Sequence, residues 1–161
     1  MEILTHPNPV LKDRAADVDP STDSDLRLLV RKMAEAMYEN QGIGLAAPQI
    51  GVQKRVIVFD VDDELAAICN PVIVERSEET VVDEEGCLSV PGISVPITRA
   101  ESVVCEGLSL TGHRIVIEAS ELVARVLQHE IDHLDGTLIL DRLSSEDRKA
   151  AIRAYNEAIS A

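Results

Sequence analysis

The sequence predicts an α+β fold in which antiparallel or mixed β-sheets pack around a central helix, with further helices toward the two ends of the chain. Two observations predict it. Apolar residues recur at helical spacing in three separate segments, and four runs rich in Val and Ile lie between the first two of these segments. Because the chain has 161 residues, of which 45% are hydrophobic, we expect a single domain over residues 1–161.

The first forty residues predict an arm followed by a helix. Residues 1–20 are rich in Pro, Asn and Asp, which indicates irregular structure with one short helical turn. From Leu26 to Met37, apolar residues recur every three or four positions, so they share one face of a helix. Thr22 or Ser24 can cap the start of this helix, and Gly42 lies where the helix should stop.

A loop and a set of strands are expected in the middle of the chain. Residues 41–51 combine glycines, a proline and small side chains, so they predict a loop whose backbone can approach another group closely. The runs that follow favour a sheet of hairpins over repeated βαβ units, with a turn at residues 110–113. These strand-like runs cover residues 55–61, 67–75, 101–110 and 113–119.

Two further helices are predicted after the strands. The first covers residues 120–134 with Ser120 as its cap, and the second covers residues 145–159 with Ser144 or Ser145 as its cap. Apolar residues flank the polar positions of the first of these helices, which indicates that it is largely buried. We therefore expect it to be the central helix of the fold.

Charge and composition exclude several classes of function. Fifteen Lys and Arg stand against 29 Asp and Glu, a formal charge of −14, which repels nucleic-acid phosphates and favours a neutral or cationic partner. Aromatic residues make up 2%, too few for a module that stacks on bases. We expect a cytoplasmic protein, because no apolar stretch can span a membrane, no signal peptide is visible, and three cysteines do not make a disulfide framework.

The predicted central helix carries the pattern His-Glu-Ile-Asp-His at residues 129–133. His129 and His133 lie one turn apart on the same helix face, so their imidazoles can bind one transition-metal ion. Glu130 then leans toward that ion, where it can accept a proton from water that the ion activates. Asp132 and Asp135 are candidates for orienting an imidazole N–H, and the sequence leaves open whether either of them does so.

A catalytic metal site needs a third protein ligand. Cys87 lies between turn formers and after acidic residues, which indicates a strained or exposed loop, and with two histidines it gives a site that suits Zn²⁺ or Fe²⁺. His6 and His113 are expected at the surface, and Cys69 and Cys105 in the core.

Glu157 is a rival third ligand. A glutamate from a later helix would make the chain a zinc endopeptidase of the thermolysin type, although Glu157 also has the context of a solvated helix residue. Substitution of Cys87 by alanine separates the two hypotheses, because it should abolish metal binding only if Cys87 is the ligand.

Three segments resemble the signature motifs of peptide deformylase in sequence, order and spacing. They are Gly-Ile-Gly-Leu-Ala-Ala-Pro-Gln-Ile-Gly at 42–51, Glu-Gly-Cys-Leu-Ser at 85–89 and Gln-His-Glu-Ile-Asp-His-Leu at 128–134. The start, Ile-Leu-Thr-His-Pro at 3–7, is similar to the N-terminal arm of the family, so the resemblance covers nearly the whole chain. It implies a metal-dependent hydrolase that removes the N-formyl group from the N-terminal formylmethionine of newly synthesised polypeptides and releases formate.

The resemblance also implies the metal site. The metal ligands of the family match Cys87, His129 and His133, and its catalytic glutamate matches Glu130. The implied cofactor is one Fe²⁺ per chain, for which Zn²⁺, Ni²⁺ or Co²⁺ can substitute.

Substrate contacts follow from the same resemblance. The amide of Gln49 and the backbone N–H of Leu88 match the groups that stabilise the oxyanion. Gly44 matches a glycine whose backbone binds the substrate peptide as an added strand. Ile43 and Leu122 fall at or near positions that line the methionine pocket.

Some features depart from the family pattern or leave alternatives open. Glu121 stands where relatives often have glycine, and Asp83 occupies a position that is apolar in some members and could touch the rim of the methionine pocket. Val95, Pro96 and Ile97 replace more polar residues of the family. Members can dock on the ribosome through a basic C-terminal helix, but residues 145–159 are less basic, and a monomer is the default expectation. A non-catalytic, deformylase-like binding module is the remaining alternative, although such a module needs no general base at Glu130.

Overall fold

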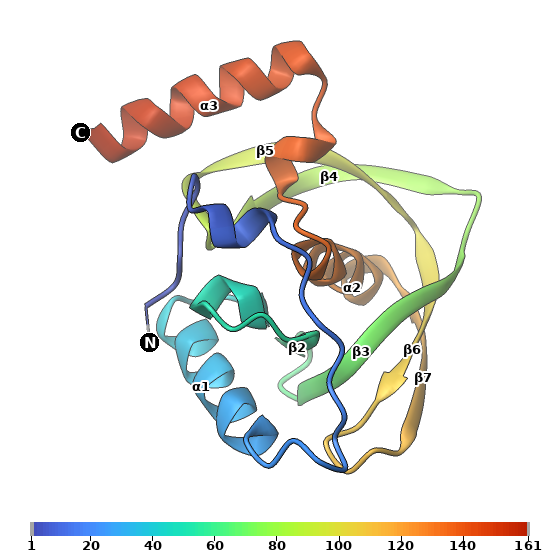
Figure 1. Ribbon diagram of the computed structural model, residues 1–161. Helices are drawn as coiled ribbons and strands as arrows, with labels where there is room; N and C mark the ends of the chain where they lie inside the picture. Colours follow the sequence, from blue (N-terminus) through green and yellow to red (C-terminus); the bar gives the residue numbers. More distant parts are fainter. Residues whose placement is uncertain (1, 161) are drawn as a thin grey trace.

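The computed structural model describes residues 2–160 and shows the chain as an α+β fold (Figure 1). Its three α-helices within this range are α1 (Leu26–Glu39), α2 (Glu121–Leu134) and α3 (Ser145–Ser160). The strands are β1 (Gly44–Ala46), β2 (Val56–Asp60), β3 (Leu65–Arg76), β4 (Thr80–Cys87), β5 (Val90–Ala100), β6 (Ser102–Leu108) and β7 (Arg114–Ser120). Short 3₁₀ turns cover Pro9–Lys12, Ala47–Ile50 and Ile139–Arg142.

Two antiparallel sheets surround helix α2. One has five strands in the order β1-β2-β3-β6-β7, and the other is the two-stranded ribbon β4–β5. In Figure 1 the ribbon arches over α2, and α3 lies across the outer side of β5. The predicted arrangement of antiparallel sheets around a central helix is therefore confirmed, with helices on either side of it along the chain.

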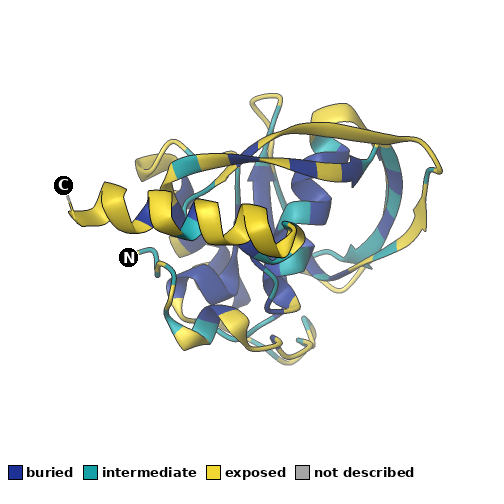
Figure 2. Cartoon of the chain, turned by 90° about the horizontal axis from the view of Figure 1, so that it is seen from above, coloured by how far each residue is buried: buried dark blue, intermediate teal, exposed yellow. Residues whose placement is uncertain are grey.

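Burial on both faces explains why β2 is so apolar. Ile57 and Phe59 belong to the core cluster beneath α2, whereas Val56 and Val58 belong to the cluster beneath α1. Successive side chains point to opposite faces of a strand, so an uninterrupted apolar run suits a strand covered by helices on both sides. Figure 2 shows this buried interior, with the mostly exposed α3 outside it.

The ribbon β4–β5 was not predicted. Acidic residues and Gly86 in β4, and Pro91, Gly92 and Pro96 in β5, hide the strand pattern, because such residues are depleted in strands. Cys87 is the last residue of β4, so the expectation that it lies in a loop is wrong. The predicted loop at 41–51 is also partly regular, since it contains β1 and the turn at 47–50.

The helix ends agree only partly with the predicted caps. Asp25 precedes α1 and Ser120 precedes α2, and neither side chain caps its helix by a hydrogen bond, so Thr22, Ser24 and Ser120 were wrong as capping side chains. Ser144 does cap α3, because its hydroxyl accepts a hydrogen bond from the Asp147 N–H at 3.2 Å. No helix within residues 2–160 is both long and apolar enough to cross a membrane.

Candidate metal centre and active site

Three donor atoms converge where α2 meets the end of β4. The Nε2 atoms of His129 and His133 lie 3.2 Å apart, and the Cys87 Sγ lies 3.3 Å from the His133 Nε2. All three donor atoms lie within 4.8 Å of one another. The i,i+4 spacing on α2 produces the histidine pair, as predicted, and the ribbon supplies the thiol.

The chemistry of this donor set fits a transition-metal ion. One thiolate and two imidazole nitrogens are ligands that Zn²⁺ and Fe²⁺ accept, with a fourth position left open. Beside them, the Glu130 Oε1 is buried and has no hydrogen-bond partner within residues 2–160. An unpaired buried carboxylate oxygen is costly, so its presence here fits a site that a bound ion and its water complete.

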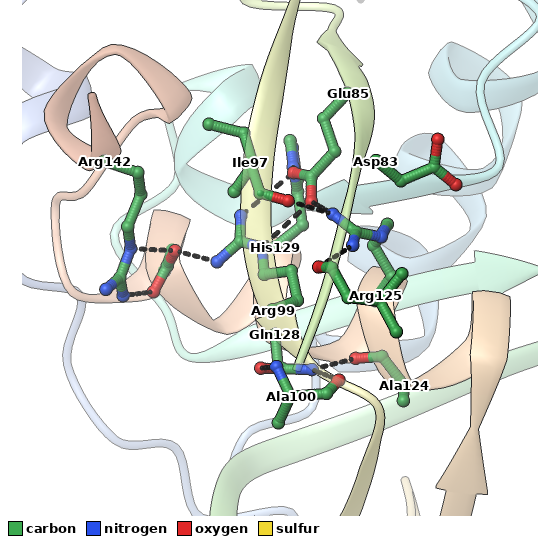
Figure 3. A network of polar contacts seen from close by, with 12 residues as sticks. Asp83, Glu85, Ile97, Arg99, Ala100, Ala124, Arg125, Gln128, His129 and Arg142 are labelled. Atoms are coloured by element: carbon green, nitrogen blue, oxygen red, sulfur yellow. Dashed lines mark hydrogen bonds and ion pairs between the residues drawn. The ribbon is translucent and has the colours of Figure 1, made fainter. Parts of the chain in front are cut away.

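Glu85 orients the first histidine. The His129 Nδ1–H donates to the Glu85 Oε1 at 2.8 Å, which leaves the Nε2 lone pair for a metal (Figure 3). Sequence reasoning missed this role and offered Asp132 and Asp135 instead. Both of those aspartates pair with arginines: Asp132 with Arg99 and Arg142, and Asp135 with Arg14 and Arg55.

Two glutamates of the site have opposite pKa shifts. Burial alone would raise the pKa of Glu85, but hydrogen bonds from His129 and Arg99 together hold it well below its usual range. Burial raises the pKa of Glu130 to about 7, because fewer compensating contacts reach this carboxyl group. Glu85 is thus a fixed charge, whereas Glu130 can hold or release a proton near neutral pH.

Gln49 is held beside the cluster by contacts at both ends of its amide. Its Oε1 accepts a hydrogen bond from the Ala46 N–H at 2.9 Å, and its Nε2 donates to the Ser89 hydroxyl at 3.0 Å. The same Nε2 lies 3.9 Å from the Cys87 Sγ, so the amide faces the metal ligands. Ser89 is fully buried, and its part in orienting Gln49 was a second contact that sequence reasoning missed.

A cavity of about 500 Å³ opens onto the cluster. Ile43 and Leu122, about half exposed, lie on its wall, and Gly44 allows a close approach. A Cβ on Gly44 would lie 2.6 Å from the Glu130 Oε2, so any larger residue would force this carboxylate to move. Most of the predicted site residues line this one cavity, among them Ile43, Gly44, Gln49, Cys87, Leu88, Leu122, His129 and Glu130.

The rival ligands lie elsewhere. Glu157 is exposed on α3 and outside the cluster, so the endopeptidase hypothesis with Glu157 as a ligand is wrong. His113 is exposed, as predicted, and His6 is partly covered by the ring of Tyr155. The other two cysteines are buried in the core, also as predicted.

Two of the three expected departures from the family pattern, at Asp83 and Glu121, lie beside the cavity, on a neighbouring groove that Leu122 and Arg125 also line. Asp83 is an exposed wall residue of that groove and does not line the cavity itself. Glu121 adopts the left-handed backbone conformation, with φ 55°, which favours glycine.

Comparison with known proteins gives one family. The family model for polypeptide deformylase matches residues 1–149. A peptide deformylase of Acidothermus cellulolyticus is 48% identical, over 94% of this chain and 83% of its own length. One from Dictyoglomus turgidum is 47% identical, over 93% of this chain and 97% of its own length.

Solved structures agree with that result. The crystal structure of a peptide deformylase from Legionella pneumophila superposes with a TM-score of 0.92 at 40% identity, covering 99% of this chain and 95% of that one. A peptide deformylase from Ehrlichia chaffeensis in complex with actinonin superposes with a TM-score of 0.90 at 41% identity. The match covers 98% of this chain and 96% of that one. The chain therefore belongs to the polypeptide deformylase family, the metal-dependent hydrolases that remove the N-formyl group from nascent peptides.

Proposed function

We propose that Cys87, His129 and His133 hold one Fe²⁺ ion, for which Zn²⁺, Ni²⁺ or Co²⁺ can substitute, and that this centre performs the deformylase reaction. The observation that carries the proposal is the convergence of one thiol and two imidazole nitrogens beside a buried glutamate. A bound ion supplies a Lewis acid that lowers the pKa of water and polarises the formyl carbonyl. Its thiolate ligand makes the centre sensitive to oxygen.

Glu130 is the proton carrier of the proposed mechanism. It accepts the proton of the attacking water and delivers it to the nitrogen of the leaving amine, so that formate and a free N-terminus result. Its burial and its pKa of about 7 support this role, because such a group exchanges a proton readily at neutral pH. The unpaired Oε1 is free for the incoming water.

Gln49 and Leu88 stabilise the oxyanion that forms on the formyl group. The Gln49 Nε2 and the Leu88 N–H donate to it, and preorganised donors are most effective because they need not reorient during the reaction. The two contacts of Gln49 with Ala46 and Ser89 support this preorganisation.

The substrate binds with its backbone against Gly44 and its methionine side chain between Ile43 and Leu122. β1 lies at the edge of the five-stranded sheet, so its free side can pair with an extended peptide. Main-chain pairing makes binding depend little on the side chains after methionine, which suits an enzyme that acts on many nascent peptides.

We infer further that residues 1–161 form one catalytic domain that works as a monomer in the cytoplasm. The proposal includes docking on the ribosome through the basic residues of α3, a helix that also carries acidic residues. Cosedimentation with ribosomes tests it. Charge reversal at Arg148, Lys149 and Arg153 should abolish any binding, and equal cosedimentation of both proteins would contradict the docking.

Two variants test the site assignments by formate release from formyl-Met-Ala-Ser. Glu130→Gln should keep the metal and lose turnover by orders of magnitude. Cys87→Ala should lose the metal and, as a consequence, activity. Retained turnover in Glu130→Gln would remove Glu130 from the mechanism, and metal retained at full affinity in Cys87→Ala would remove Cys87 from the ligand set.

A further inference from the structure

Arg125 connects three parts of the β4–β5 ribbon to helix α2. It lies on α2 one turn before His129, and its Nη1 donates to the Glu85 Oε2 at 2.5 Å and to the Ile97 carbonyl at 2.9 Å (Figure 3). Its Nη2 donates to the Val81 carbonyl at 2.8 Å. Since Val81 and Glu85 belong to β4 and Ile97 to β5, one guanidinium ties both strands to the helix.

The ion pair between Arg125 and Glu85 is buried. Arg125 is 8% exposed and Glu85 is 7% exposed. The Glu85 carboxylate accepts from four nitrogens, one of His129, two of Arg99 and one of Arg125, so both of its oxygens are saturated. Arg99 belongs to β5 and donates directly to Asp132 of α2, whereas Arg125 belongs to α2 and donates to the backbone of both strands.

The contact between Arg125 and Glu85 lies close in sequence to Cys87, the third proposed metal ligand. Glu85 precedes Cys87 by two residues in β4, and the register of the ribbon shifts between Gly86 and Cys87. Helix α2 supplies His129 and His133, and the ribbon supplies Cys87, so the geometry of the cluster depends on how the ribbon lies on the helix. The position of the thiolate relative to the two imidazoles is therefore a property of the contacts between these two elements.

We propose that Arg125 is a positioning residue that sets the place of the Cys87 thiolate relative to His129 and His133 by fastening the ribbon to α2. The inference rests on the ligand set of the proposed function and adds a residue whose hydrogen bonds go to the ribbon and to none of the three ligands. A guanidinium suits this task, because its planar fork serves a carboxylate and two carbonyls at once.

Two substitutions of Arg125 show whether its hydrogen bonds to the ribbon matter or only its positive charge. Arg125→Met keeps the length and apolar stem but removes every donor, so the bound metal should dissociate about 10-fold to 100-fold faster, the usual effect of losing an outer contact of a metal site. Arg125→Lys keeps the buried charge, but one ammonium group cannot replace the planar guanidinium. The dissociation rate of the metal should therefore lie between those of the wild type and Arg125→Met. Arg114→Met is the matched control, because Arg114 is exposed and pairs with Glu106, far from the metal ligands in sequence and on the other sheet.

The experiment loads the full chain with Zn²⁺ and measures its transfer to a chromophoric chelator. The same proteins are then loaded with Co²⁺, whose visible bands report the arrangement of the thiolate and imidazoles around the ion. A shift of these bands in Arg125→Met and not in Arg114→Met is expected. General destabilisation without displacement of Cys87 would leave the bands in place, and circular dichroism shows whether each variant is folded.

The outcomes are distinct. Faster Zn²⁺ loss and shifted Co²⁺ bands in both Arg125 variants, with Arg114→Met unchanged, support the tie. Wild-type rates and bands in Arg125→Lys would overturn it, even if Arg125→Met does not fold, because charge alone would then suffice. Failure of the wild-type chain to hold Zn²⁺ or Co²⁺ would instead overturn the ligand set of the proposed function, and this inference with it.

Discussion

Helix α2 and the β4–β5 ribbon both bring ligands to the metal centre, but they do so by different physical means. In α2 the helical repeat sets His129 and His133 on one face, so local backbone hydrogen bonds bring the two imidazoles together. A two-stranded ribbon is only marginally stable alone in water, so the place of Cys87 depends on side-chain contacts with the rest of the fold. The histidine pair is a local property of one helix, whereas the thiolate position is a tertiary property.

Breaking the buried ion pairs of the ribbon should have the largest effect on stability. Glu85→Gln leaves the guanidiniums of Arg99 and Arg125 without their shared carboxylate, and removal of one partner from a buried ion pair typically costs about 3–5 kcal/mol. Urea unfolding of the metal-free proteins measures this cost without a contribution from metal binding.

The matched control for that variant is Glu106→Gln. Glu106 pairs with Arg114 near the surface of the five-stranded sheet, so its loss should cost about 0–1 kcal/mol. Equal losses in the two variants would mean that the buried pairs do not hold the ribbon in place.

Removal of the metal should expose one thiol and leave two protected. Burial raises the pKa of Cys69 to about 11 and that of Cys105 to about 11, so at pH 8 both remain protonated thiols as well as inaccessible ones. Cys87 is partly exposed and lines the cavity, so it should react with iodoacetamide in the metal-free protein and be protected after Zn²⁺ is added. Mass spectrometry of the digested protein locates the label, and modification of Cys69 or Cys105 at the rate of Cys87 would contradict this account.

The smallest expected effect concerns the start of α2. Glu121 holds a left-handed backbone conformation at a cost of about 1 kcal/mol, so Glu121→Gly should stabilise the protein by up to that amount. Glu146→Gly, in the first turn of α3, should instead destabilise it by about 0.5–1 kcal/mol, because glycine there only adds chain entropy. Thermal unfolding compares the two variants, and a stability change of the same sign in both would contradict the strain at Glu121.

Sequence reasoning succeeded where one element carries its own pattern. The apolar repeat around His129 and His133 predicts a buried helix, and the i,i+4 spacing predicts that the two imidazoles meet. The same holds for β2, where an apolar run such as Val56–Phe59 suits a strand that helices cover on both sides. The motif resemblance supplied Cys87, Gln49 and Glu130 as partners in one site, and the structure brings these three residues together around one cavity.

Sequence reasoning failed where contacts between elements that are distant in the chain determine the structure. The acidic run before Cys87 has the composition of a solvated loop, yet Glu85 is buried because Arg99 and Arg125 neutralise it. Neither arginine is near Glu85 in sequence, so no local pattern signals the pairing. Alternation along the strand was the one available signal, since it places Glu85 on the same side as Cys87.

The most direct test of the central claim uses protein purified without oxygen. Metal content and formate release from formyl-Met-Ala-Ser are measured on the same sample. About one Fe²⁺ or Zn²⁺ per chain together with rapid formate release is the predicted result, because the thiolate and two imidazoles bind one ion and leave a position open for the reaction. A chain that contains no metal, or that releases formate equally well after its metal has been removed, would contradict the three-ligand centre and the mechanism derived from it.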